Sequence, residues 1–154
     1  GYFTYQDDPP FKSFGRKPDL SDLTEISLKK LSKENSFFIM IEGSQIDWAG
    51  EDNDLGNLIS EFKDFDSAVS KALSFAKKDG NTLVIVTADH ESGGLALTGG
   101  NVEKSRIRGS FSSRGHTGSM VPVFSYGPSS NLFKGIYENT AIFEKMLKAL
   151  NSSK

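Results

Sequence analysis

The clearest hydrophobic pattern in the chain is a helical stripe that runs from residue 55 to residue 76. Apolar side chains recur there mainly at intervals of three or four residues, the spacing of one buried helix face. The stripe contains Leu55, Leu58, Ile59, Phe62, Phe65, Val69, Ala72, Leu73 and Ala76. Asp52 and Asp54 precede it, where negative charge suits a helix N-terminus, and Gly80 follows it as a suitable C-terminal cap. The pattern predicts one long helix.

Two shorter helices are predicted on either side of it. Residues 20–33 follow Asp19, a good N-cap, and residues 140–150 carry the last apolar stripe of the chain. The expected buried positions are Leu20, Leu23, Ile26 or Ser27 and Leu31 in the first helix, and Ile142 or Phe143, Met146, Leu147 and Leu150 in the last.

Three short apolar runs, at residues 37–41, 82–87 and 121–126, are too brief for helices and predict strands. The first two show no alternation of apolar and polar positions, which is typical of strands buried on both faces in a parallel sheet. Strands that alternate with helices predict an α/β layered fold with mostly parallel strands and helices on both faces. In such sheets ligands bind beyond the carboxyl ends of the strands.

Composition narrows the function classes. The chain has 154 residues, enough for a single domain, and its net charge of −2 argues against a nucleic-acid binder. There is no cysteine, so thiolate metal sites and disulfides are excluded. No apolar run approaches the length of a membrane helix. Residues 1–18 are expected to form an extended arm, and the Gly/Ser/Thr-rich residues 92–120 a loop, with Arg106, Arg108 and Arg114 on its surface.

Candidate chemistry follows two of the predicted strands. Glu42 comes directly after residues 37–41, and Asp47 lies five residues beyond it. An unpaired carboxylate at the mouth of an apolar strand is costly unless it meets a cation, so both are candidate metal ligands. Asp89 and His90 follow residues 82–87, and oxygen and imidazole donors are the set that zinc accepts when thiolate is absent.

Each of these signals has an alternative. Asp89 can cap a turn while His90 donates to a backbone carbonyl, and His116, between glycines in a polar loop, can be an exposed histidine without a role. Together, however, they carry a resemblance. The strings IEGSQIDWAG, TLVIVTADHESGG and GHTGSMVPVFSYGP resemble, in order and spacing, the alkaline phosphatase family over nearly the whole chain. The chain resembles the C-terminal portion of such an enzyme.

The resemblance implies a hydrolase of phosphate monoesters that uses two zinc ions and one magnesium ion. It implies that Asp47 and His116 bind one zinc, Asp89 and His90 the other, and Glu42 the magnesium. Trp48 occupies a position that faces the phosphate and varies in the family. For His116, which precedes its strand, to meet ligands that follow theirs, residues 121–126 are expected to form an antiparallel edge strand.

The sequence departs from the family pattern at Glu51, where the family has histidine as the third ligand of the first zinc. A carboxylate can also bind zinc, but its negative charge is expected to weaken the activation of bound water or to deplete the site. The family's Asp-Ser-Ala segment around the nucleophilic serine has no counterpart here. We therefore expect that the nucleophile lies outside this chain and that the chain alone is inactive.

The resemblance also implies partners and a location. The expected partners are phosphate monoesters and the N-terminal portion of the same enzyme. Binding to nucleic acid or to a membrane is not expected, and a homodimer is an open alternative. A periplasmic or secreted location is expected. Alternatives are a related phosphodiesterase, sulfatase or phosphoglycerate mutase on the same scaffold, and a non-catalytic metal-binding or interaction domain.

Overall fold

The computed structural model describes residues 18–152, and the expected arm over residues 1–18 lies almost wholly outside the described residues. Its helices are α2 (Leu20–Leu31), α3 (Gln45–Glu51), α4 (Leu55–Asp79) and α5 (Ala141–Ser152), with a short 3-10 helix η1 (Ser130–Phe133). Its strands are β1 (Val84–Val86), β2 (Glu91–Ser92), β3 (Ala96–Asn101), β4 (Arg106–Ser110), β5 (His116–Thr117) and β6 (Phe124–Tyr126).

Helix α4 is the longest element and spans the predicted stripe, but the prediction of Phe62 on the buried face is wrong, since this side chain is 56% exposed. The side chain of Asp54 caps it by accepting a hydrogen bond from the Asn57 amide at 3.0 Å. Gly80 ends it with a left-handed φ of 75°, as expected for a glycine cap. Asp52, which we expected at the start of this helix, instead caps the C-terminus of α3.

Helix α2 packs along α4 and begins as predicted. Asp19 and Asp22 form a reciprocal capping box, in which the Asp22 amide donates to Asp19 at 2.8 Å. The buried positions are Leu20, Thr24 and Leu28, one helical turn apart. The prediction of Ile26 on the buried face is wrong, since this side chain is 59% exposed. Its alternative, Ser27, lies at intermediate depth. In helix α5 the prediction of Leu147 and Leu150 on the buried face is also wrong, since they are 40% and 57% exposed and Ala149 is buried instead.

The strands pair in three two-stranded ladders within the described residues, and all three are antiparallel: β1 with β6, β2 with β5, and β3 with β4. The expectation of an antiparallel strand within residues 121–126 is confirmed by the pairing of β6 with β1. The expectation of mostly parallel strands is wrong for this part of the chain. Residues 92–120, expected to be a loop, contain the β3–β4 hairpin and β5.

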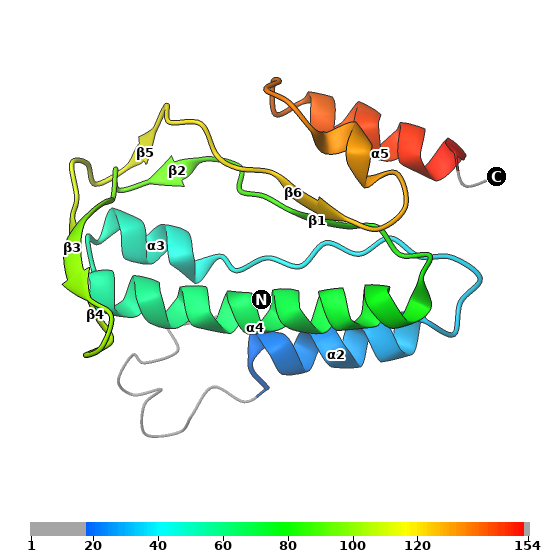
Figure 1. Ribbon diagram of the computed structural model, residues 1–154, viewed down its shortest axis with the longest axis horizontal. Coiled ribbons are helices and arrows are strands. Elements are labelled where there is room, and N and C mark those ends of the chain that lie inside the picture. Colours follow the sequence, from blue (N-terminus) through cyan, green and yellow to red (C-terminus); the bar gives the residue numbers. More distant parts are fainter. Residues whose placement is uncertain (1–17, 153–154) are drawn as a thin grey trace.

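The predicted strand at residues 37–41 is absent from the described structure, in which this segment has no assigned secondary structure. It runs as an extended chain between α4 and the β1–β6 ladder (Figure 1). Its side chains alternate in exposure, with Phe38 68% and Met40 80% exposed. The expectation of a strand buried on both faces is therefore wrong, because one side of the segment has no cover within the described residues.

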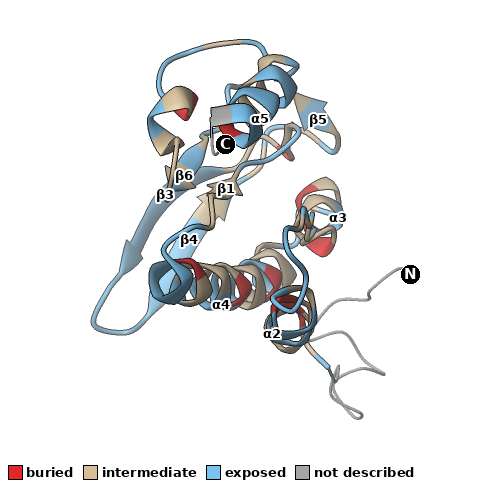
Figure 2. Ribbon diagram, turned by 90° about the vertical axis from the view of Figure 1, so that its right-hand side faces the viewer, coloured by how far each residue is buried: buried red, intermediate tan, exposed pale blue. Residues whose placement is uncertain are grey.

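The elements stack in layers. The β1–β6 ladder lies between α5 on one side and α4 on the other, and α2 lies beyond α4 (Figures 1 and 2). This arrangement confirms the α/β class with helices on both faces of the central ladder. Buried apolar side chains are few, and small ones such as Ala49, Ala68 and Ala76 mark where helices approach closely. None of the helices in the described range is long and apolar enough to cross a membrane.

Candidate metal centre

Helix α3, which the hydrophobic pattern did not predict, places two of the candidate ligands. Asp47 and Glu51 are four residues apart on it, so both side chains lie on the same helix face. The opposite positions, Gln45 and Ala49, are buried. The helix therefore presents two carboxylates together toward the strand ladders.

The two histidines reach the same place from other elements. His90 follows β1 and immediately precedes β2, whereas His116 begins β5. In the antiparallel β2–β5 ladder His116 lies opposite Ser92, two residues after His90. The imidazole rings of His90 and His116 stack with their centroids 3.4 Å apart and their planes at 18°.

The side chain of Asp47 lies beside both rings. Its Oδ1 is 3.9 Å from Nδ1 of His90 and 3.7 Å from Nε2 of His116. Nε2 of His116 is also 3.5 Å from Oε1 of Glu51. Asp47, His90 and His116 each offer one ligand atom within 4.8 Å of the others. Three residues that are distant in sequence thus converge.

The donor set fits a divalent cation. Two ligand atoms bound to a tetrahedral zinc at about 2.0–2.2 Å are roughly 3.3–3.6 Å apart. The Asp47 oxygen is 3.7 and 3.9 Å from the two imidazole nitrogens, slightly wider than in a tetrahedral zinc site. Carboxylate oxygen and imidazole nitrogen are ligands that zinc accepts. The side chains of Asp47 and His90 are 31% and 26% exposed, so an ion can reach them from solvent.

The other predicted site residues lie around this cluster or apart from it. Asp89 has its Oδ2 3.3 Å from Nε2 of His90, but its side chain is 86% exposed. Glu42 is exposed and does not belong to the Asp47–His90–His116 group. Trp48, the next residue after Asp47 on α3, is 41% exposed. The ligand and substrate roles of all these residues stay predictions.

Sequence reasoning gave no role to three residues that hold this cluster. Ser92 donates a hydrogen bond to Asp47 and lies 3.2 Å from His90, while Thr117 donates to Glu91. Only their positions in the sequence could have indicated a role at the metal centre. Glu91 and Ser92 come directly after Asp89-His90, and Thr117 comes directly after His116.

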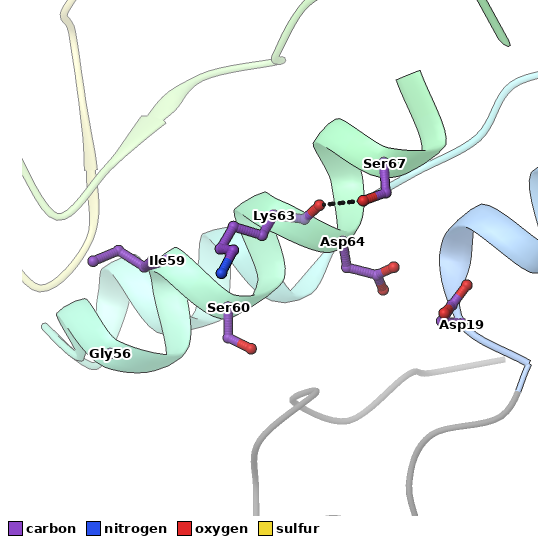
Figure 3. Close-up of a pocket in the computed structure, with 7 residues that line it drawn as sticks. All are labelled: Asp19, Gly56, Ile59, Ser60, Lys63, Asp64 and Ser67. Atoms are coloured by element: carbon purple, nitrogen blue, oxygen red, sulfur yellow. Dashed lines mark hydrogen bonds between the residues drawn. The ribbon is translucent and has the colours of Figure 1, made fainter. Parts of the chain in front are cut away.

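A surface depression elsewhere on the molecule does not contain any of the predicted site residues (Figure 3). It has a volume of about 430 Å³ and lies along α4 beside the start of α2. Asp64, which lines it, accepts a hydrogen bond from the Leu20 amide at 3.3 Å, and Ser67 donates to the Lys63 carbonyl at 2.9 Å. The first contact joins the start of α2 to α4, and the second lies within α4.

Comparison with known proteins identifies the fold around the cluster. The family model described as alkaline phosphatase matches residues 11–108 and 100–152. The chain belongs to the alkaline phosphatase family. Alkaline phosphatase 3 of Bacillus subtilis is 34% identical over 86% of this chain.

Solved structures agree with this assignment. The alkaline phosphatase from the Antarctic bacterium TAB5 is 53% identical, with a TM-score of 0.81 over 91% of this chain. A variant of that enzyme with magnesium bound is 51% identical, with the same TM-score of 0.81 over 91% of the chain. The chain spans 44% of the Bacillus protein's length and 43% of the TAB5 chain. It therefore corresponds to less than half of these phosphatases.

Proposed function

We propose that this chain is the metal-binding portion of a metal-dependent phosphate monoester hydrolase. The observation that supports this most directly is the convergence of Asp47, His90 and His116 within 4.8 Å of one another. We assign one zinc to Asp47, Glu51 and His116, the other to Asp89 and His90, and magnesium to Glu42. Divalent ions, when bound, stabilise the charge on phosphoryl oxygens and lower the pKa of a bound water.

The side chains of α3 have separate tasks in this proposal. Asp47 lies beside both imidazoles and supplies negative charge to offset that of a bound cation. Glu51, 3.5 Å from His116, adds a second carboxylate to the same end of the site. Trp48, the next residue on α3 and 41% exposed, tunes the affinity for the phosphate product.

Phosphoryl transfer also needs a nucleophile and usually a guanidinium clamp. We propose that both come from the N-terminal portion of the same enzyme, because the family's Asp-Ser-Ala segment has no counterpart in this sequence. The chain's 44% share of the Bacillus phosphatase leaves ample length for that portion. The isolated 154-residue chain is accordingly expected to bind metal and not to turn over substrate. We further propose a periplasmic or secreted enzyme, with a homodimer as the assembly to test.

The deciding experiment uses the complete polypeptide in which this sequence occurs. We expect it to hydrolyse p-nitrophenyl phosphate, to prefer it to bis(p-nitrophenyl) phosphate and p-nitrophenyl sulfate, and to lose activity in EDTA. Asp47→Asn should abolish turnover, whereas the matched change Asp66→Asn, at an exposed position of α4, should not. A preference for the diester or the sulfate ester would contradict the monoesterase proposal.

The isolated chain gives a second test. Metal binding without turnover is the expected result, and EDTA-sensitive hydrolysis by the pure chain would contradict an external nucleophile. If the complete polypeptide also binds metal without turnover of any ester, the alternative of a non-catalytic metal-binding domain is correct. That alternative draws on Glu51, which replaces the family's histidine.

A further inference from the structure

The dipeptide Glu91-Ser92 joins every part of the candidate metal centre. It follows His90 without a break and forms β2, which pairs with β5 so that Ser92 lies opposite His116 and Glu91 opposite Thr117. Strand β2 also contacts α3, the helix that carries Asp47. Two residues thus lie between all three elements that supply ligands.

The hydroxyl of Ser92 contacts two members of the cluster. It donates a hydrogen bond to Oδ1 of Asp47 and lies 3.2 Å from Nδ1 of His90. A hydroxyl has one hydrogen to give and lone pairs to accept with, so it can serve a carboxylate and a ring N–H together. With Nδ1 of His90 acting as donor to Ser92, the Nε2 of that ring is left free of its proton to act as a ligand.

The carboxylate of Glu91 holds the other side of the site. Its Oε2 accepts from the Gly94 amide and from the hydroxyl of Thr117, and its Oε1 accepts from the Leu95 amide, both amides lying at 3.2 Å. Glu91 therefore fixes the turn after β2 and, through Thr117, the strand that begins with His116.

The backbones of α3 and of the segment that contains β2 lie too close together to admit side chains at two glycines. Gly93 has a φ of 82°, and a Cβ built there would collide with the carbonyl of Gly50 on α3. A Cβ on Gly50 would in turn lie 3.0 Å from the carbonyl of Ser92. Helix α3 and strand β2 are thus in direct backbone contact, which brings the Ser92 hydroxyl within reach of Asp47.

We propose that Ser92 and Glu91 are positioning residues of the metal centre. Ser92 orients Asp47 and His90, which the proposed function assigns to two neighbouring zinc ions, and Glu91, acting through Thr117, sets the position of His116. This inference rests on the proposed metal-binding function and adds to it the residues that preorganise the ligands. Outer partners of metal ligands typically contribute 10–100-fold in metal affinity.

The test measures metal affinity of the full chain, independently of turnover. Zn²⁺ and Co²⁺ titrations followed by calorimetry, with the visible spectrum of bound Co²⁺ as a second readout, compare wild type, Ser92→Ala and Ser92→Thr. We expect Ser92→Ala to lose about 10–100-fold in affinity and to alter the Co²⁺ spectrum. Ser92→Thr keeps the hydroxyl and should retain affinity. Ser70→Ala, at an exposed position of α4, is the matched control and should match wild type.

A second pair of variants covers the case in which Ser92→Ala does not fold. Thr117→Val removes the donor to Glu91 with little change in shape and should lower affinity, whereas Thr117→Ser should restore it. Equal affinity of wild type, Ser92→Ala and Thr117→Val would overturn the positioning roles. Absence of metal binding by the wild-type chain would instead overturn the proposed function itself, so that the two failures are distinguishable.

Discussion

Nε2 of His116 lies 3.5 Å from Oε1 of Glu51, the residue that stands where the alkaline phosphatase pattern has histidine. The carboxylate and the imidazole therefore meet at one end of the candidate metal centre, and Asp47 adds a second carboxylate 3.7 Å from the same nitrogen. In the proposed ligand set, an ion bound there would face the two carboxylates of Asp47 and Glu51 and the one neutral imidazole of His116. This excess of negative charge distinguishes the chain from the family pattern.

The first prediction concerns this charge. Glu51→His should raise zinc occupancy of the complete polypeptide and shift its pH–rate profile to lower pH, because a neutral ligand leaves the zinc a stronger Lewis acid. Zinc content and the pH dependence of p-nitrophenyl phosphate hydrolysis are the measurements. Glu51→Gln, which offers only an amide, should lower occupancy. An unchanged profile and full zinc occupancy in wild type and both variants would show that Glu51 has no such effect.

The second prediction compares two glycines with left-handed backbones. Gly80 has a φ of 75° and open space around a Cβ, whereas Gly93 has a φ of 82° and faces the Gly50 carbonyl and the Phe111 ring. Gly80→Ala should lower the free energy of unfolding by about 1–2 kcal/mol. Gly93→Ala should cost roughly 1–3 kcal/mol more, as overpacking does. Urea unfolding of both variants measures this, and equal losses would refute the close contact between α3 and β2.

The third prediction concerns pH and stability. Nζ of Lys71 on α4 lies 2.6 Å from Oε2 of Glu25 on α2. Hydrogen bonding and charge from Lys71 hold the pKa of Glu25 below its usual value, and Glu25 raises the pKa of Lys71. A lowered carboxyl pKa stabilises the fold above the pKa of the unfolded state, and this contribution is lost as pH falls through the folded-state pKa.

The raised pKa of Lys71 has the opposite pH dependence. Its contribution to stability is present at neutral pH and is lost as pH rises through the folded-state pKa. The lowered pKa of Glu25 can be tested by measuring the unfolding temperatures of wild type and Glu25→Gln between about pH 3 and 7. The two unfolding temperatures should become equal at the acidic end, around and below the usual glutamate pKa of about 4.3. The separation at neutral pH should be small, since the pair is exposed and screened by salt. A difference in unfolding temperature that grows toward acid pH would contradict a lowered pKa of Glu25.

The fourth prediction concerns Gln45, the first residue of α3. Its side chain is 2% exposed, and neither Oε1 nor Nε2 has a hydrogen-bond partner among the described residues. An unsatisfied buried polar group costs about 1–3 kcal/mol, so Gln45→Met, which keeps the size and removes both polar atoms, should raise the free energy of unfolding by a similar amount. Gln45→Glu should lower it. Loss of stability in the Met variant would mean that the amide is satisfied in solution.

The helices were predictable where a periodic stripe and its caps occur together. Helix α4 has a long apolar stripe, Asp54 at its start and Gly80 at its end, and α2 has the Asp19 cap. Helix α3 was missed because its seven residues are too few to show a stripe and contain Gly50. Because α3 was not predicted, the sequence did not indicate that Asp47 and Glu51 share one helix face.

The strands were harder to predict. The β3–β4 hairpin is polar, rich in glycine and exposed throughout β3, so backbone hydrogen bonds define it without an apolar signature. The opposite error occurred at residues 37–41, where a continuous apolar run suggested a strand buried on both faces. The convergence of Asp47, His90 and His116 agrees with the resemblance, but the linking roles of Glu91 and Ser92 needed the β2–β5 register.

The alternating exposure of residues 37–41 has a consequence for Glu42, which follows them directly. Phe38 and Met40 are 68% and 80% exposed, so the described residues leave that side of the segment largely uncovered. The carboxylate of Glu42, which we assign to magnesium, therefore follows an apolar segment whose exposed side chains must be covered before the segment is held firmly in place. If Glu42 binds magnesium as proposed, uptake of that ion and covering of this side of residues 37–41 are expected to be linked equilibria, in which each event strengthens the other.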